Sequence, residues 1–307
     1  MRTLPRVVVW ASAVLTLGLA GCNCDPTGGA DSGADAGPPD AGPPDAGPSR
    51  DDAGCPLPTG LVLDPTAAGL PDAGLRLWLR PDLGLATLDG GAVCRWEDLS
   101  GHLNHFTPAF ATAPRLASSG LRGHPAVSFT NGLGLIRPGV LGLAATSGRA
   151  VALIGLATDL THRFEYFVQG QAGSPGTYFG TDMNTFQTSG AREGVEVTNN
   201  AFDSDLATAA EVRTQVLSIS SFAPGGSLPG VLQYWVSGVQ RTLTRIPAGL
   251  GNGTVEDFSG ANYTAVGGGE GAFTGALLGD LLVYDHALTD PERLAVEAYF
   301  QRRYPAP

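Results

Sequence analysis

Short apolar or alternating runs, separated by turn-forming residues, are the feature that most limits what this chain can fold into. In Leu75–Arg80 the leucines alternate with Arg76, Trp78 and Arg80, which predicts a strand with its leucines on one face. The short runs, with 44 glycines and 23 prolines in the chain, indicate an all-β sandwich or barrel rather than β–α–β units. Ten further runs predict strands: Ala92–Glu97, Ala126–Thr130, Val151–Ala157, Phe164–Val168, Thr177–Gly180, Gly194–Thr198, Arg213–Ser220, Val231–Ser237, Tyr263–Gly267 and Leu277–Tyr284.

The C-terminal segment has a helical pattern instead. Thr289 and Glu292 stand three residues apart, which is the spacing of a capping box with Thr289 at the N-cap. The spacing predicts one amphipathic helix over Pro291–Tyr304. Its apolar face, which includes Tyr299 and Phe300, is too narrow to be stable alone, so we expect it to pack on the β-domain.

The N-terminus has the features of an export signal. Arg2 and Arg6 precede an uncharged apolar run, Val7–Ala20, which is shorter than the roughly 20 residues that a membrane-spanning helix needs. The run ends in Leu-Ala-Gly-Cys at Cys22, which resembles the lipobox of bacterial lipoproteins. We therefore expect acylation of Cys22 and anchoring to membrane lipid. Asn23, where Asp often retains lipoproteins at the inner membrane, favours the outer membrane or cell surface. An ordinary secretory signal cut elsewhere is the alternative.

The segment after the signal repeats Asp-Ala-Gly-Pro and has nothing apolar to form a core, so it is expected to be disordered. Proline and like-charged aspartates keep such a chain extended, with a reach of about 90 Å. The expected organisation is a signal peptide over 1–21, a linker over 22–55 and a folded domain over 56–307.

Charge and cysteine content narrow the possibilities further. The net charge is −11 and all 18 basic residues are arginines with no basic run, which argues against nucleic acid as a partner. If Cys22 is lipidated, Cys24, Cys55 and Cys94 remain in an oxidising compartment. A disulfide between Cys55 and Cys94 is favoured, although Cys24 could pair with Cys55 instead. Zinc is not expected, because the metal-binding Cys and His spacings do not occur.

Two blocks resemble the laminin-G-like jelly rolls of the concanavalin A-like lectin/glucanase superfamily. The first is W-x-D-x-S-G-x-x-N, and the second is V-Y-x-x-A-L-[ST]-x-x-E, which leads into the C-terminal helix. The resemblance implies an antiparallel jelly-roll sandwich with one C-terminal helix. Asp280 stands near the last strand where the family commonly has Glu. The motif residues are Trp96, Asp98, Ser100, Gly101, Asn104 and Asp280.

No cofactor is expected, with calcium as the one alternative. The oxygen side chains of Asp98 and Asn104 are weak candidates for a calcium loop, since short oxygen ligands in a turn suit a hard cation. The favoured interpretation is a structural turn, in which Asp98 and Ser100 cap backbone N–H groups and Gly101 takes a positive φ.

Catalysis is not expected, because the E-x-D-x-x-E and E-x-D-x-E patterns, which turn carboxylates of one strand toward the same cleft, do not occur. Glu193 and Glu196 are three residues apart and should point to opposite faces of a strand. We therefore expect a surface lipoprotein whose lectin-like module binds a glycan or an envelope protein. The alternatives are a structural envelope protein and an unusual hydrolase, which a pair of acids facing one cleft would favour. Aromatic residues expected in or near loops that could stack on sugar are Tyr166, Tyr178, Phe186, Phe202 and Tyr263.

Overall fold

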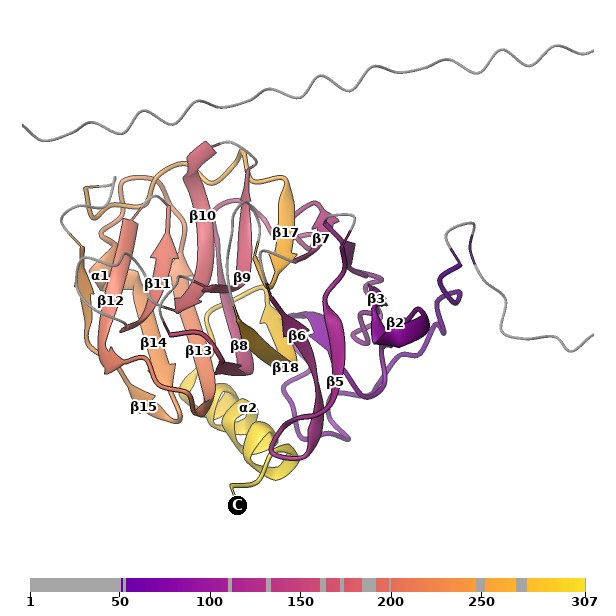
Figure 1. The fold of residues 1–307 in the computed structure, drawn as a ribbon. Coiled ribbons are helices and arrows are strands. Elements are labelled where there is room, and N and C mark those ends of the chain that lie inside the picture. Colours follow the sequence, from indigo (N-terminus) through magenta and orange to yellow (C-terminus); the bar gives the residue numbers. More distant parts are fainter. Residues whose placement is uncertain are drawn as a thin grey trace, which may run out of the picture. The chain divides into compact units, whose positions relative to one another are not determined.

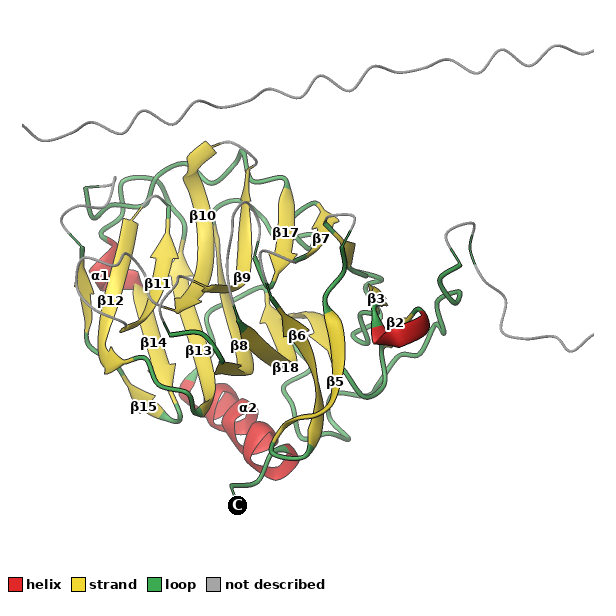
Figure 2. Cartoon of the chain, in the orientation of Figure 1, coloured by secondary structure: helices red, strands yellow, loops and turns green. Residues whose placement is uncertain are grey.

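The computed structural model describes residues 51, 54–109, 112–130, 134–160, 164–171, 174–183, 192–198, 200–246, 252–268 and 275–306. All of them belong to one compact unit, Ala46–Pro307. Antiparallel strands make up about half of the described residues, and α2 is the one long helix among them (Figure 2). Cys22, Cys24 and nearly all of the expected linker lie outside the described residues.

The first sheet joins the two ends of the folded unit. Within the described residues its strand order is β15-β14-β13-β8-β18-β6-β5, and β1 pairs with β18 beside β6. The late strand β18 therefore lies at the centre, between β8 on one side and β6 and β1 on the other. The strands are β1 (Leu75–Leu79), β5 (Arg115–Leu121), β6 (His124–Phe129), β8 (Ser147–Ala157), β13 (Val212–Ser221), β14 (Leu232–Val236), β15 (Val239–Gln240) and β18 (Ala276–Tyr284).

The second sheet packs over the first, as Figure 1 shows. Its order among the described residues is β16-β12-β11-β10-β9-β17-β7-β4, and its neighbouring strands pair antiparallel throughout this part of the chain. The strands are β4 (Thr107–Pro108), β7 (Leu135–Pro138), β9 (Phe164–Gln171), β10 (Ser174–Met183), β11 (Arg192–Val197), β12 (Asn200–Ala207), β16 (Leu243–Arg245) and β17 (Tyr263–Val266). The remaining elements are the pair β2 (Leu85–Thr87) and β3 (Val93–Trp96), with η1 (Asp89–Gly91) and the short helix α1 (Leu228–Val231).

The main core lies between the two sheets. Alternation places one side chain in two on this inner side, and the buried set draws on both layers, for example Leu153 of β8 and Phe167 of β9. Trp96 of β3 belongs to this core and has no exposed surface.

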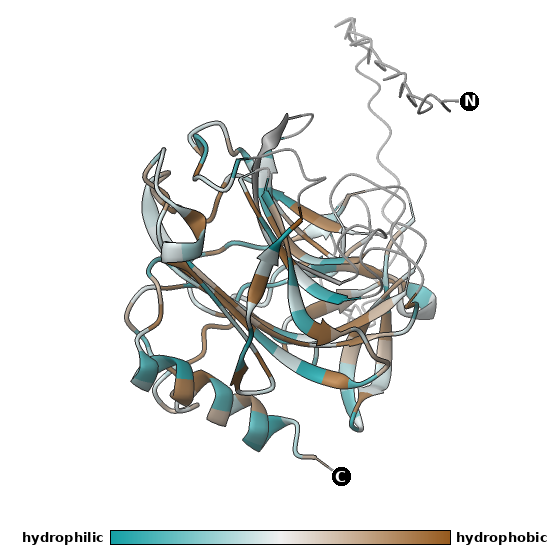
Figure 3. Ribbon diagram, turned by 90° about the vertical axis from the view of Figure 1, so that its left-hand side faces the viewer, coloured by the Kyte–Doolittle hydropathy of each residue, from teal (hydrophilic) through white to brown (hydrophobic). Residues whose placement is uncertain are grey.

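A second core lies on the outer side of the first sheet, beneath α2 (Asp290–Arg303). Figure 3 shows α2 outside the two layers, with hydrophilic and hydrophobic residues alternating along it. Tyr299 and Phe300 of α2 are buried against Trp78 and Ile154 of the sheet. The predicted capping box of Thr289 and Glu292 is present.

The expected all-β architecture with one C-terminal helix is confirmed, and the eleven predicted strands all coincide with strands of the structure. One prediction of side-chain orientation in β1 is wrong. Leu75 does not share the inner face with Leu77 and Leu79 but joins Trp78 in the second core, because the β1–β18 register shifts between Leu75 and Leu77. The strands β5 and β12 are not predicted, because both stretches are rich in polar residues and β5 also contains a glycine. No helix among the described residues is long and apolar enough to cross a membrane.

Candidate binding site

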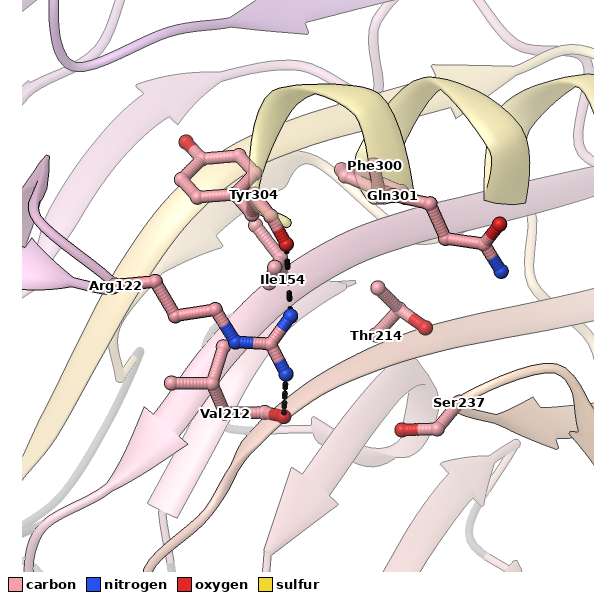
Figure 4. A pocket seen from close by; sticks show the side chains of 8 residues that line it. All are labelled: Arg122, Ile154, Val212, Thr214, Ser237, Phe300, Gln301 and Tyr304. Carbon is pink, nitrogen blue, oxygen red and sulfur yellow. Dashed lines mark hydrogen bonds between the residues drawn. The ribbon is translucent and has the colours of Figure 1, made fainter. Parts of the chain in front are cut away.

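A cavity of about 160 Å³ opens where the end of α2 meets the first sheet (Figure 4). Its side chains come from α2, β8, β13 and two hairpin turns that are distant in sequence. The turns connect β5 to β6 and β14 to β15. The lining residues are Arg122, Ile154, Val212, Thr214, Ser237, Phe300, Gln301 and Tyr304.

The floor of the cavity is apolar and its rim is polar. Ile154, Phe300 and Tyr304 are buried, whereas Arg122 and Gln301 are exposed at the opening. An apolar floor with a few convergent polar groups is the usual composition of a small-molecule site.

Arg122 enters the cavity from the first position of a two-residue turn. Its guanidinium donates one hydrogen bond to the carbonyl oxygen of Tyr304 at 2.7 Å and a longer one to that of Val212 at 3.4 Å (Figure 4). A guanidinium has five N–H donors, so further donors remain. No carboxylate among the described residues pairs with Arg122. The turn and the helix end therefore hold a positive charge in place at the cavity.

Three neutral polar side chains complete the rim. Thr214 lies on β13, Ser237 lies in the β14–β15 turn and Gln301 lies on α2 (Figure 4). None of these three side chains forms a hydrogen bond with another residue of the part that the structure describes. Their hydroxyl and amide groups are therefore available to a ligand that displaces water from the cavity.

The floor is held rigidly from behind by Asp280 of β18. This carboxylate has no exposed surface, accepts hydrogen bonds from Tyr299 and from Tyr304 at 2.7 Å, and pairs with Arg303 at 2.6 Å. Burial raises the pKa of Asp280, and the Arg303 charge and the two tyrosine hydroxyls oppose that rise. Burial, followed by the charge of Asp280, raises the pKa of Tyr304, so this hydroxyl stays protonated as a donor. Asp280 thus joins the last strand to the helix that frames the cavity.

The second sheet places acidic side chains on its outer face. Val195 of β11 and Phe202 of β12 are paired and point into the core, so Glu196 and Asp203, which follow them, point outward. Glu165 of β9 occupies the same cross-strand row as Asp203. Glu165 and Asp203 are nearly inaccessible, at 4% and 6% exposure. Residue patterns within single strands do not reveal this face, because its acidic residues come from β9, β11 and β12.

Glu193 lies on the opposite side, inside the sandwich, so it and Glu196 face apart as predicted. The Glu193 carboxylate accepts hydrogen bonds from Arg213 at 3.0 Å and from Gln215 at 2.9 Å, both on the other sheet. Burial raises the pKa of Glu193 to about 7, and the Arg213 charge limits that rise. The same burial, with Glu193 nearby, raises the pKa of Tyr166.

The predicted Asp98 loop has the geometry of a structural turn. The Asp98 carboxylate accepts hydrogen bonds from the backbone N–H groups of Trp78 at 3.0 Å, Ser100 at 2.9 Å and Asn104 at 3.0 Å. Gly101 has a φ of 87°. No three His, Cys, Asp or Glu side chains of the described ranges are grouped to hold a metal ion. The Asp98 carboxylate holds β1 against the loop through the N–H of Trp78, and calcium binding there stays the untested alternative to the predicted structural turn.

The other predicted positions are distributed as follows. Cys55 and Cys94 form the expected disulfide, across 39 residues. Of the aromatic residues expected to be exposed, Tyr166, Phe202 and Tyr263 are buried at 5% exposure or less, so that prediction is wrong for them. They sit in strands, where alternation turns them toward packed layers. The side chain of Tyr178 and the whole of Phe186 lie outside the described residues.

Comparison with known proteins gives a likeness of fold. No family model matches the chain, and no curated protein matches it. A GH54 α-L-arabinofuranosidase soaked with a cyclic sulfate inhibitor is 13% identical, with a TM-score of 0.52 over 76% of this chain and 60% of that chain. Trypanosoma rangeli sialidase in complex with sialic acid is 15% identical, with a TM-score of 0.49 over 76% of this chain and 34% of that chain.

Domain 4 of a GH43 extracellular arabinanase from Geobacillus stearothermophilus, in complex with arabinotriose, is 16% identical. The TM-score is 0.46, over 74% of this chain and 98% of that domain. This chain therefore spans about a third of the sialidase and less than two thirds of the arabinofuranosidase. The likeness to the arabinofuranosidase supports the β-sandwich fold.

Proposed function

We propose that this chain is an exported lipoprotein, anchored through Cys22, whose laminin-G-like sandwich binds a glycan in the cavity beside α2. The observation that carries the proposal is the cavity itself. It combines a buried apolar floor with Arg122, Thr214, Ser237 and Gln301, whose hydrogen-bonding groups point to a ligand of many hydroxyls.

Three features support the proposal. The chain resembles a superfamily that contains lectins, in its W-x-D-x-S-G-x-x-N and V-Y-x-x-A-L blocks. One solved structure with a TM-score above 0.5 is a GH54 α-L-arabinofuranosidase. Fold similarity alone does not define function, so the cavity carries the argument. A linker of about 30 residues would hold the module clear of the membrane.

A glycan array tests the binding. The exported chain with Cys22→Ser, which lacks the acylated residue, is labelled and applied to a broad array of envelope and environmental glycans. We expect binding to a restricted group of glycans, and loss of that binding in Gln301→Ala, because this side chain lies at the rim. An array without any positive glycan would contradict the proposal and favour a structural or protein-binding role.

Lipidation is tested separately in the producing cells. Metabolic labelling with a palmitate analogue is expected to mark the wild-type chain and to move it to the membrane fraction. Cys22→Ser is expected to remove both effects, whereas Cys24→Ser, two residues away, should leave them unchanged. Labelling that survives Cys22→Ser would contradict the anchor.

A hydrolase is the second candidate, and the outer face of the second sheet is the observation in its favour. Glu196 is opposite Ala201, two residues from Asp203 on the adjacent strand. Such diagonal positions are about 7 Å apart, within the range for two carboxyl groups of an inverting glycosidase. Release of reducing sugar from a polysaccharide panel, abolished by Glu196→Gln and by Asp203→Asn, would establish this candidate. No release from the panel would remove it.

A further inference from the structure

The cavity beside α2 also indicates which kind of sugar it accepts. Resting on the proposed glycan binding, we infer that the cavity receives a single sugar unit that carries a carboxylate. Arg122 receives the carboxylate, and the neutral rim residues receive the ring hydroxyls. The inference depends on the charge of the cavity, on its volume and on the backbone conformation of two hairpin turns that line it.

The charge at the cavity is positive. Arg122 is the one charged residue of the lining, and no carboxylate in the described ranges pairs with it. The acids next to this region already have partners, and Asp280 behind the floor pairs with Arg303 at 2.6 Å. Glu297, near the Gly238 side of the rim, pairs with Arg293 at 2.8 Å, and Glu211, next to Val212, pairs with Arg213 at 3.4 Å. A planar carboxylate suits the donors that the Arg122 guanidinium has left.

The size of the cavity limits the ligand to one sugar unit. A volume of about 160 Å³ is well below the 300 to 1,000 Å³ that is typical of sites for drug-sized ligands. The rest of a longer glycan would have to extend into solvent past Gln301 and Ser237, which are both exposed. The buried floor of Ile154 and Phe300 would then contact the apolar C–H groups of the ring.

The backbone at two turns supplies an independent observation. Arg122 and Ser237 have φ values of 50° and 51° and are each followed by a glycine with positive φ, at 83° and 78°. Two-residue hairpin turns of this kind favour Asn, Asp or Gly at the first position. Arginine and serine occupy it here, in two separate hairpins, and both line the same cavity. Residues that break a local rule in this way concentrate at functional sites.

The test is a titration of the exported Cys22→Ser chain with three probes. NMR chemical shifts or calorimetry measure the binding of each probe. Glucuronic acid supplies a carboxylate and hydroxyls, glucose supplies hydroxyls alone, and acetate supplies a carboxylate alone. We expect glucuronic acid to bind about tenfold more tightly than either of the others, because a charge-assisted hydrogen bond is added to the neutral ones. Equal affinity for glucuronic acid and glucose would overturn the inference.

Variants assign the binding to this cavity. Arg122→Gln should abolish the preference for glucuronic acid over glucose, and Gln301→Ala should weaken the binding of both sugars. Gln301 is exposed on α2, and alanine favours helix, so this variant should fold. Leu103→Asn is the matched control, because Leu103 also has a positive φ of 57° but does not line the cavity.

The outcomes separate this inference from the proposed function. Leu103→Asn is expected to bind all three probes like the parent chain. A preference for glucuronic acid that survives Arg122→Gln would overturn the role of Arg122. If the array shows glycan binding that Arg122→Gln and Gln301→Ala both leave intact, the inference fails and the lectin function stands at another site.

Discussion

At the scale of single residues, this protein retains groups in positions that cost stability. Glu193 is a carboxylate at 2% exposure between two sheets, and Ser237 is a non-glycine residue with left-handed backbone. Glu193 joins the two sheets through its hydrogen bond with Arg213, and Ser237 lines the cavity. Each can be altered without removing a large side chain from the core.

Glu193 should make stability depend on pH. Its pKa of about 7 in the folded state lies above the usual 4.5, so the folded state binds its proton more tightly than the unfolded state does. This contribution is fully present below about pH 4.5 and is lost as the pH rises through 7. Between pH 5 and pH 8, the wild type should lose about 2 kcal/mol of unfolding free energy relative to Glu193→Gln. Urea unfolding of both proteins at the two pH values measures this change. Parallel pH profiles would contradict this expectation.

Ser237→Gly should stabilise the β14–β15 hairpin. Glycine takes the φ of 51° without the Cβ clash, which gives an expected gain of about 1 kcal/mol in the free energy of unfolding. Ser237→Ala keeps the Cβ and is the control, which should show no gain. Thermal and urea unfolding measure both variants. A gain with alanine as large as that with glycine would show that backbone strain is not the cause.

At the scale of elements, α2 is held by polar contacts as well as by its apolar face. The Thr289–Glu292 capping box begins the helix, and Asp280 of β18 binds Tyr299, Arg303 and Tyr304 near its end. The sequence predicts the helix and its cap because both depend on residues close together in the chain. It does not predict the Asp280 contacts, since they join side chains 19 to 24 residues apart across a packed interface.

Asp280→Ala should destabilise the protein severely. The change leaves the buried hydroxyls of Tyr299 and Tyr304 without their acceptor and removes the buried partner of Arg303, and breaking a buried pair in this way costs about 3 to 5 kcal/mol. Asp82→Ala is the control, because Asp82 also pairs with Arg303, at 2.5 Å, but lies nearer the surface. That change should cost less than about 1 kcal/mol. Urea unfolding of the two variants compares them, and similar losses would show that burial is not decisive.

At the scale of the whole molecule, one disulfide attaches the beginning of the folded unit to β3. Cys55 is the last residue of the expected linker, and the bond to Cys94 closes a loop of 39 residues. Any force transmitted through the linker therefore reaches the sandwich through this bond as well as through the backbone. The bond was predicted from export and from the positions of the cysteines.

Removal of this disulfide should lower the free energy of unfolding by about 3 to 4 kcal/mol, because the unfolded chain regains the entropy of the open loop. The measurement is urea unfolding of the Cys55→Ser, Cys94→Ser double variant beside the wild type. Adding a reductant to the wild type should lower its stability to that of the variant, and a reductant should not affect the variant. Equal stability of variant and oxidised wild type would contradict the expectation.

The sequence by itself determined the class of fold, because strand alternation, helix capping and turn residues act over a few neighbouring positions. It placed eleven strands, the C-terminal helix and the Cys55–Cys94 bond. The tertiary structure alone decided which strands pair and which side chains meet. Arg122 and Gln301 are 179 positions apart, and only the packing of α2 on the first sheet brings them to one cavity. Such pairings depend on the burial of whole faces in two layers, which no local pattern of residues encodes.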